Sequence, residues 1–120
     1  MKKLIFIACD TNKISEAKKI INQTHTNKLN IGYKFGLEFL YSKNGRDFIS
    51  KIKRKKIFLD LKLNDIPVTC SKSLMSLKDL KNVKYITLHA NAGEETIKED
   101  VKTAKKINTK LKILQVTELK

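Results

Sequence analysis

Short apolar runs alternate along the chain with longer segments in which apolar residues recur at helical spacing. The apolar runs, rich in Leu, Ile, Val and Phe, predict β-strands at residues 4–9, 29–35, 57–63, 83–88 and 111–116. The intervening segments predict helices at 13–23, at 37–41 and 46–52 with a turn at Asn44-Gly45, at 67–80 and at 94–107. A regular alternation of strands and helices is typical of a parallel sheet with helical crossovers. The sequence therefore predicts an α/β fold of about four βα units plus a fifth parallel strand.

The third predicted strand, 57–63, carries two charges in a run that is otherwise apolar. Successive side chains of a strand point to opposite faces, so Asp60 and Lys62 share one face and the leucines share the other. On this spacing alone, a strand with a solvated outer face explains the pair as well as a functional site does. Asp65 then adds a second acid, and Pro67 stands where a helix can begin. Charges at a strand–loop–helix junction are typical of the catalytic edge of an α/β barrel, which favours the functional interpretation.

Other polar residues also fall at or near the carboxyl ends of the predicted strands. Parallel α/β sheets gather their ligand-binding residues at this edge, and charges placed by chance are not expected to sort there. The candidates are Asp10, Lys34, Asp60, Lys62, His89 and Thr117. The sequence therefore predicts that these side chains converge on one functional edge, although for His89 a structural role is favoured over substrate contact.

The chain is strongly basic, with 26 Lys and Arg against 12 Asp and Glu and a net charge of +14. Such a charge raises nucleic acid as a partner. The lysines are spread over every segment, however, and the one dense basic run, 51–56, contains no aromatic residue. We therefore interpret 51–56 as a solvated turn and do not expect nucleic acid binding. A phosphate-bearing substrate would also be attracted by this charge.

Cysteine usage, hydropathy and length narrow the class of protein further. Cys9 and Cys70 have no spacing typical of a zinc site or a redox motif, so we expect both to be reduced and buried in a cytoplasmic protein. No apolar run approaches the roughly 20 residues needed to cross a bilayer, so we expect no membrane contact. The 120 residues suffice for one domain, 1–120, but not for a complete eight-stranded barrel of about 250 residues.

The residues after Phe58 form a motif that points to a family. Asp60-x-Lys62-x-x-Asp65-Ile66-Pro67-x-Thr69 resembles the signature of the orotidine 5'-phosphate decarboxylases. Further segments agree in the same order: Ala8-Cys9-Asp10, Tyr33-Lys34-Phe35-Gly36, Leu88-His89-Ala90 and Val116-Thr117. Related sugar-phosphate decarboxylases and aldolases share the Asp-x-Lys-x-x-Asp part of the motif, whereas the following Ile-Pro-x-Thr favours the orotidylate enzyme.

The resemblance implies both a fold and a reaction. It makes the chain similar to the N-terminal half of a TIM (β/α) barrel that decarboxylates orotidine 5'-monophosphate to UMP in pyrimidine biosynthesis, with no metal and no organic cofactor. The catalytic residues that it implies are Lys34, Asp60, Lys62 and Asp65. Lys62 would stabilise the carbanion at C6 and donate its proton, with Asp60 near the departing carboxylate.

The resemblance also implies substrate-binding residues and a homodimer with shared active sites. The implied binding residues are Asp10, Lys34, Ile66, Thr69 and Thr117. Asp10 and Lys34 would hydrogen-bond the ribose hydroxyls, while Asp65 and Thr69 would reach into the neighbouring subunit's site beside Ile66. For Thr117, contact with the pyrimidine and a simple capping role both stay open.

The chain matches only about the first half of the family's length. The family grips the substrate phosphate with loops after its seventh and eighth strands, and the chain ends after the fifth. Because remote phosphate binding drives much of such catalysis, we expect little or no activity from this chain alone, whether it is a truncation, a fragment or half of a split enzyme. Two alternatives stay open: a related sugar-phosphate decarboxylase or aldolase, and a non-catalytic basic half-barrel that serves as an interaction module.

Overall fold

The computed structural model describes residues 3–63, 77, 80–89, 94–107 and 111–116. Within these ranges the strands are β1 (Leu4–Ala8), β2 (Asn30–Gly36), β3 (Ile57–Leu63), β4 (Val83–His89) and β5 (Lys112–Val116). The helices are α1 (Ile14–Gln23), α2 (Leu37–Leu40), α3 (Gly45–Ser50) and α5 (Glu94–Ile107). The helix predicted at 67–80 lies outside the described residues, apart from Leu77 and Leu80, which are buried.

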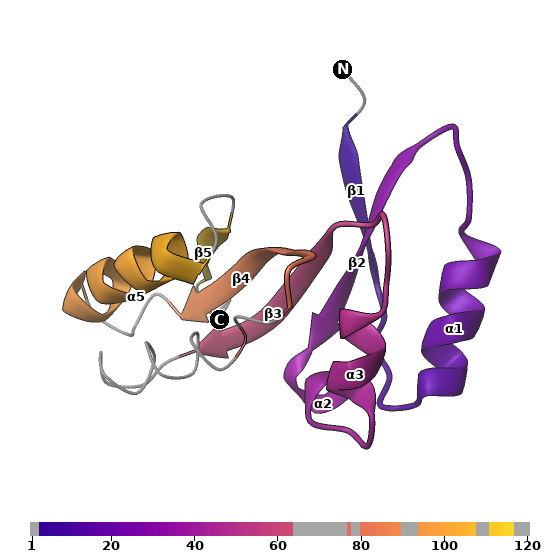
Figure 1. Ribbon diagram of the computed structural model, residues 1–120, viewed down its shortest axis with the longest axis horizontal. Helices are drawn as coiled ribbons and strands as arrows, with labels where there is room; N and C mark the ends of the chain where they lie inside the picture. The colour runs from indigo at the N-terminus through magenta and orange to yellow at the C-terminus, as the bar shows by residue number, and fades with distance from the viewer. Residues whose placement is uncertain (1–2, 64–76, 78–79, 90–93, 108–110, 117–120) are drawn as a thin grey trace.

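The five strands form one parallel sheet, in which they lie side by side in the order of the chain. Helices α1, α2 and α3 lie alongside the β1–β2 end of the sheet, and α5 lies alongside β5 at the other end (Figure 1). The predicted parallel α/β sheet is confirmed. Because every strand runs in the same direction, the carboxyl ends of all five strands meet at one edge.

One face of the sheet forms the core with the helices. Tyr33 and Phe35 of β2, and Ile57 and Leu59 of β3, have no exposed surface. Burial of a large apolar side chain contributes about 1.5–3 kcal/mol, so these alternating positions hold the helices against the sheet. The helices supply Ala17, Phe39, Leu40, Ile49 and Ala104 to the same cluster. The Tyr33 hydroxyl lies 2.7 Å from the hydroxyl of Thr24, which gives this buried group a hydrogen-bond partner.

The opposite face of the sheet carries an aromatic cluster. Phe6, Phe58 and Tyr85 come from β1, β3 and β4, and their ring centroids are 5.4, 5.6 and 5.9 Å apart in pairs. Asp60 follows Phe58 by two residues, and Thr87 follows Tyr85 by two. The alternation of a strand therefore places the aromatic cluster next to the polar residues at the carboxyl edge.

The turn predicted at Asn44-Gly45 separates α2 from α3. Asn44 has a φ of 64°, in the left-handed region where asparagine is common among non-glycine residues. A β-carbon on Gly45 would collide with the backbone oxygen of Phe39, so the close approach of the two short helices requires glycine. The helix predicted at 46–52 is shorter than expected, since α3 ends at Ser50.

Candidate active site

Strands β3 and β4 lose their regular pairing at the carboxyl edge. Leu59 lies opposite Ile86 and Leu63 lies opposite Leu88, so residues 60–62 of β3 face the single residue between them on β4, Thr87. Irregularities of this kind re-aim side chains and are over-represented next to active sites. This one falls on Asp60-Leu61-Lys62, the segment that carries the first two charges of the motif.

Asp60 is held by groups from both neighbouring strands. The Thr87 hydroxyl donates a hydrogen bond of 2.8 Å to Asp60 Oδ1, and the Lys34 ammonium lies 3.9 Å from Asp60 Oδ2. The side chains of Asp60 and Lys34 are 19% and 34% exposed, so both groups keep access to solvent. At 3.9 Å the ion pair is loose, and the Thr87 hydroxyl makes the tighter of these two contacts.

Sequence reasoning missed Thr87. The residue is only 2% exposed, and a buried hydroxyl needs a hydrogen-bond partner. Its signal in the sequence is a hydroxyl two residues before the carboxyl end of β4. The identity of the partner depends on the register between β3 and β4, which the sequence does not give.

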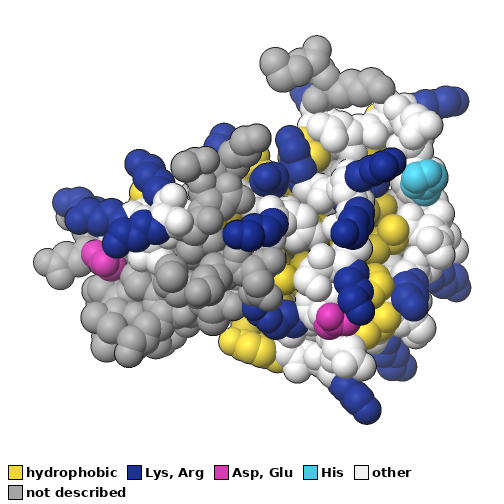
Figure 2. Space-filling model, viewed as in Figure 1, with side chains coloured by type: hydrophobic (Ala, Val, Ile, Leu, Met, Phe, Trp, Pro, Cys, Tyr) yellow, Lys and Arg dark blue, Asp and Glu magenta, His cyan; other side chains and the backbone are white. Residues whose placement is uncertain are grey.

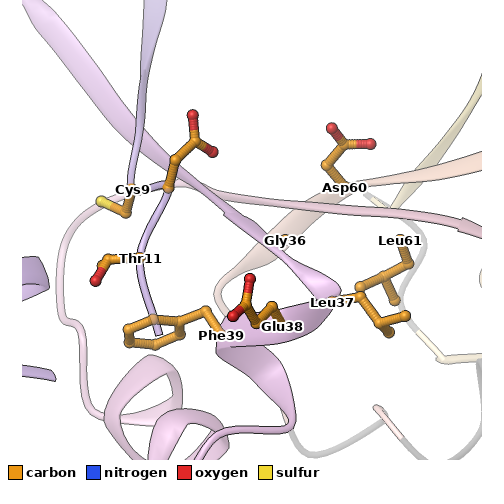
Figure 3. A pocket seen from close by; sticks show the side chains of 9 residues that line it. Cys9, Thr11, Gly36, Leu37, Glu38, Phe39, Asp60 and Leu61 are labelled. Carbon is orange, nitrogen blue, oxygen red and sulfur yellow. The ribbon is translucent and has the colours of Figure 1, made fainter. Parts of the chain in front are cut away.

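A pocket of about 410 Å³ opens at the same edge of the sheet. Three successive strands and the segments after them supply its lining: Cys9, Asp10 and Thr11; Gly36, Leu37, Glu38 and Phe39; and Asp60 with Leu61. Figure 3 shows that the carboxylates of Glu38 and Asp60 come from different elements around this space. The pocket thus brings together Asp10 and Asp60, two of the predicted site residues, and Lys34 pairs with the second of them.

Backbone hydrogen bonds hold the loop that carries Asp10. The Cys9 N–H donates to the Lys34 carbonyl at 2.9 Å, which continues the pairing with β2 beyond β1. The Thr11 N–H donates to the Cys9 carbonyl at 2.9 Å, and the Thr11 hydroxyl accepts the Lys13 N–H at 3.0 Å. Asp10 therefore sits in a short, hydrogen-bonded turn beside the pocket and not on a long loop.

Cys9 lines the pocket as a thiol. Burial raises the pKa of Cys9 to about 11, and the negative charge of Asp10 acts in the same direction. A nucleophilic cysteine needs a lowered pKa, so Cys9 is not set up for covalent catalysis. The expectation that Cys9 is buried is confirmed, its reduced state stays a prediction, and Cys70 lies outside the described residues.

The other predicted site residues lie wholly or partly outside the part of the chain that the structure describes. Lys62 belongs to β3, but its side chain is not among the described ones. The residues outside the described ranges are Asp65, Ile66, Thr69 and Thr117, and their roles stay predictions. His89 is the last residue of β4 and lies opposite Val116 of β5, at the predicted edge.

The described residues contain no group of three or more His, Cys, Asp or Glu side chains arranged to hold a metal ion. None of the helices in the described ranges is both long and apolar enough to span a membrane. Among the groups that the described residues bring to the carboxyl edge are carboxylates, the Lys34 ammonium group, hydroxyls and the Cys9 thiol.

Fold and site together define a parallel (β/α) sheet with a charged carboxyl edge. The chain belongs to the orotidine 5'-phosphate decarboxylase / HUMPS family, whose model matches residues 3–120. An orotidine 5'-phosphate decarboxylase of Fusobacterium nucleatum is 34% identical over 121 residues, and one of Staphylococcus epidermidis is 37% identical over 123 residues. These matches cover 99% of this chain but 49% and 50% of the relatives. The chain therefore spans about half the length of the curated relatives it matches.

Solved structures agree with this assignment. The crystal structure of orotidine 5'-phosphate decarboxylase from Lactobacillus acidophilus matches 98% of this chain and 54% of its own, with a TM-score of 0.85 and 30% identity. The orotidine 5'-monophosphate decarboxylase of Methanocaldococcus jannaschii, complexed with the inhibitor BMP, matches 98% of this chain and 53% of its own, with a TM-score of 0.78 and 31% identity. The predicted family and the predicted partial TIM barrel are both confirmed.

Proposed function

We propose that this chain carries the N-terminal half of the active site of an orotidine 5'-phosphate decarboxylase, a carboxy-lyase that forms UMP in pyrimidine biosynthesis. The observation that carries the proposal is the environment of Asp60. This residue stands at the irregular pairing of β3 with β4, accepts a hydrogen bond from Thr87 and pairs with Lys34. The curated relatives, which are orotidine 5'-phosphate decarboxylases, support the reaction class, and the relative from Methanocaldococcus jannaschii supports a nucleotide-like ligand through its inhibitor BMP.

In this proposal, the reaction breaks the bond between C6 of the orotate ring and its carboxyl carbon. The electron pair stays on C6 as CO2 leaves, and the Lys62 ammonium stabilises that charge and then donates the proton to C6. Asp60 lies beside the departing carboxylate, and Thr87 and Lys34 hold the two carboxylate oxygens of Asp60 in place. Repulsion between the two carboxylates is relieved as CO2 becomes neutral, so this contact favours the transition state over bound substrate.

The four proposed catalytic residues alternate in charge, which lowers the free-energy cost of placing them in a partly buried site. Lys34, Asp60, Lys62 and Asp65 contribute two positive and two negative groups, so the array is near neutral. A near-neutral array limits the desolvation penalty that unpaired buried charges would incur. Asp10 lines the same pocket as Asp60, and we assign it with Lys34 to the ribose hydroxyls.

We further propose a cytoplasmic homodimer in which each active site draws on both subunits. Asp65 and Thr69 of one subunit reach the neighbour's substrate, Ile66 packs beside them, and Thr117 contacts the pyrimidine. The proposal rests on the match of these residues to the family's motif. It has a direct consequence for mixed dimers, since one subunit's Lys62 then works with the other subunit's Asp65.

To test activity, this chain is joined to the C-terminal half that the longer relatives contain. A fusion of residues 1–120 to the C-terminal half of the Lactobacillus acidophilus enzyme is assayed by the loss of orotidylate absorbance. Turnover is expected, and Lys62→Ala should lower kcat by about 10²–10⁴-fold, the usual contribution of a general acid. Lys43→Ala, which removes an exposed lysine between α2 and α3, is the matched control and should leave kcat unchanged. A Lys62→Ala fusion as active as the control would refute the assignment.

Mixing two inactive fusions tests the shared site. Lys62→Ala and Asp65→Asn each disable a different part of the array, so each alone should be nearly inactive. A mixed dimer places both defects in one site and leaves the other site intact, so activity should return after subunit exchange. Exchange without recovery would place Asp65 in its own subunit's site.

A sugar-phosphate lyase is the second candidate, because the family's name also covers the HUMPS members. Ile66-Pro67-x-Thr69 argues for the orotidylate enzyme. The same fusion, offered ketose phosphates in place of orotidine 5'-monophosphate, separates the two. A basic interaction module is the remaining alternative, and strongly salt-dependent binding of nonspecific DNA by the chain, with no binding of a UMP analogue, would favour it.

A further inference from the structure

A second pocket, of about 570 Å³, lies at the amino ends of the strands, opposite to the carboxyl edge that carries Asp60. It forms where the end of α1 and the segment before β2 meet α3 and the segment before β3. The lining residues are Lys18, Ile21, Asn22, His25, Asn27, Phe48, Ile52, Lys53, Arg54 and Lys55. We call this cavity the basic pocket. It shares no lining residue with the pocket at the carboxyl edge, and the proposed decarboxylase chemistry does not use it.

The rim of the basic pocket carries positive charge that no carboxylate of its lining neutralises. Four cations line it, and no Asp or Glu does. Within the described residues, none of the four forms an ion pair, whereas the neighbouring Lys51 pairs with Asp47 at 2.8 Å on the surface of α3. The cations are Lys18, Lys53, Arg54 and Lys55. Like charges around one concavity repel each other, so an anionic group bound there lowers the electrostatic energy.

The floor of the basic pocket is apolar. Ile21, Phe48 and Ile52 are each half-buried and border the hydrophobic core. In Figure 2, hydrophobic side chains emerge between dark blue Lys and Arg side chains over the half of the molecule that carries α1 and α3. Inorganic phosphate or an extended polyanion would leave these side chains in water, whereas a ligand with a flat ring would cover them.

The backbone of the rim is held in an uncommon conformation. Arg54 has a φ of 63°, a left-handed conformation that costs a non-glycine residue free energy. Glycine or asparagine would adopt this conformation at lower cost. Strained backbone conformations are common at ligand sites, and the guanidinium of arginine suits phosphate recognition. Arg54 at the rim of this cavity therefore points toward binding.

We propose that the basic pocket binds a nucleoside di- or triphosphate, independently of the decarboxylase site. The several negative charges of the phosphate chain match Lys18, Lys53, Arg54 and Lys55, while the base covers Phe48 and Ile52. Asn22 and His25 stand at the wall as hydrogen-bonding groups. The volume lies within the range of about 300–1,000 Å³ that is usual for small-molecule sites.

Titration calorimetry of the chain with ATP, at physiological ionic strength, tests the proposal. Lys53→Gln/Lys55→Gln should weaken binding by about tenfold, since two phosphate contacts are lost. The matched control is Lys105→Gln/Lys106→Gln, which removes the same charge from exposed positions on α5 and should change the affinity by less than about twofold. Equal weakening in both double variants would mean diffuse attraction to a basic protein and would overturn the proposal.

A second comparison tests the apolar floor. ATP should bind more tightly than inorganic tripolyphosphate, and Phe48→Leu should reduce that difference without changing tripolyphosphate binding. Equal affinity for the two probes in the unmodified chain would overturn the role of the floor. A single-stranded RNA oligonucleotide is the third probe. If RNA bound far more tightly than ATP and lost that binding in Lys53→Gln/Lys55→Gln, the occupant would be a nucleic acid and the proposal would be wrong.

Discussion

Replacing Thr87 by valine removes the hydroxyl that donates a hydrogen bond to Asp60 in the candidate active site. Valine has nearly the shape of threonine, so no cavity forms, but it lacks the hydroxyl that donates to Asp60 Oδ1 at 2.8 Å. Thr87 is 2% exposed, so water does not readily take the place of the hydroxyl itself. Asp60 keeps the Lys34 ammonium at 3.9 Å, which is too distant to replace the lost contact.

The size of the effect follows from the charge and exposure of the acceptor. Hydrogen bonds to charged groups contribute about 1.5–3 kcal/mol. The Asp60 side chain is 19% exposed, so water compensates for part of the loss and the lower end of that range applies. We therefore expect Thr87→Val to reduce the free energy of unfolding by about 1.5 kcal/mol. In the active fusion, a comparable loss of Asp60 positioning should lower kcat about tenfold.

Urea unfolding followed by circular dichroism measures the first quantity, and the orotidylate assay of the fusion measures the second. Thr103→Val is the matched control, because Thr103 is 6% exposed and its hydroxyl donates to the Glu99 carbonyl at 3.0 Å within α5, away from the site. This control should cost less stability, since a threonine bond to the preceding turn of a helix adds little. It should leave kcat unchanged.

A double-mutant cycle with Asp60→Ala isolates the contact from other consequences of either change. Residues that share a hydrogen bond are expected to couple by at least about 0.5 kcal/mol. The reasoning fails if Thr87→Val costs no more than Thr103→Val and the coupling with Asp60→Ala is indistinguishable from zero.

Gly45→Ala should destabilise the chain by about 1–3 kcal/mol in urea unfolding, because its β-carbon would strike Phe39, whereas Gly36→Ala meets nothing within 4 Å and should cost far less. Burial raises the pKa of Cys9 from 9.0 to about 11, so Cys9 should resist alkylation by iodoacetamide at neutral pH until the chain is unfolded. The free energy of unfolding should fall as pH rises above about 9, since the unfolded state then loses the thiol proton first. In the described sheet β1 pairs only with β2 and β5 only with β4, so size-exclusion chromatography should show association, and a monodisperse monomer at high concentration would contradict this.

Much of this protein follows from local patterns in its sequence. The alternation of apolar runs with helical spacing predicts the parallel sheet, and the observed strand bounds lie within one residue or so of the predicted ones. The Asp60-x-Lys62-x-x-Asp65-Ile66-Pro67-x-Thr69 motif identifies the family, which the family model then confirms. Both signals depend on residues close together in the chain, so neither needs knowledge of which strand lies beside which.

The contacts that define the two pockets depend instead on register and on lateral packing. Thr87 reaches Asp60 only because residues 60–62 of β3 face one residue of β4, and the two partners are 27 positions apart. The basic pocket similarly joins the end of α1 to the segment before β3, and its run at 51–56, which we expected to be a simple solvated turn, supplies three of the cations around an apolar floor. Strand register and helix placement depend on side-chain packing across the whole sheet, which no local sequence pattern specifies.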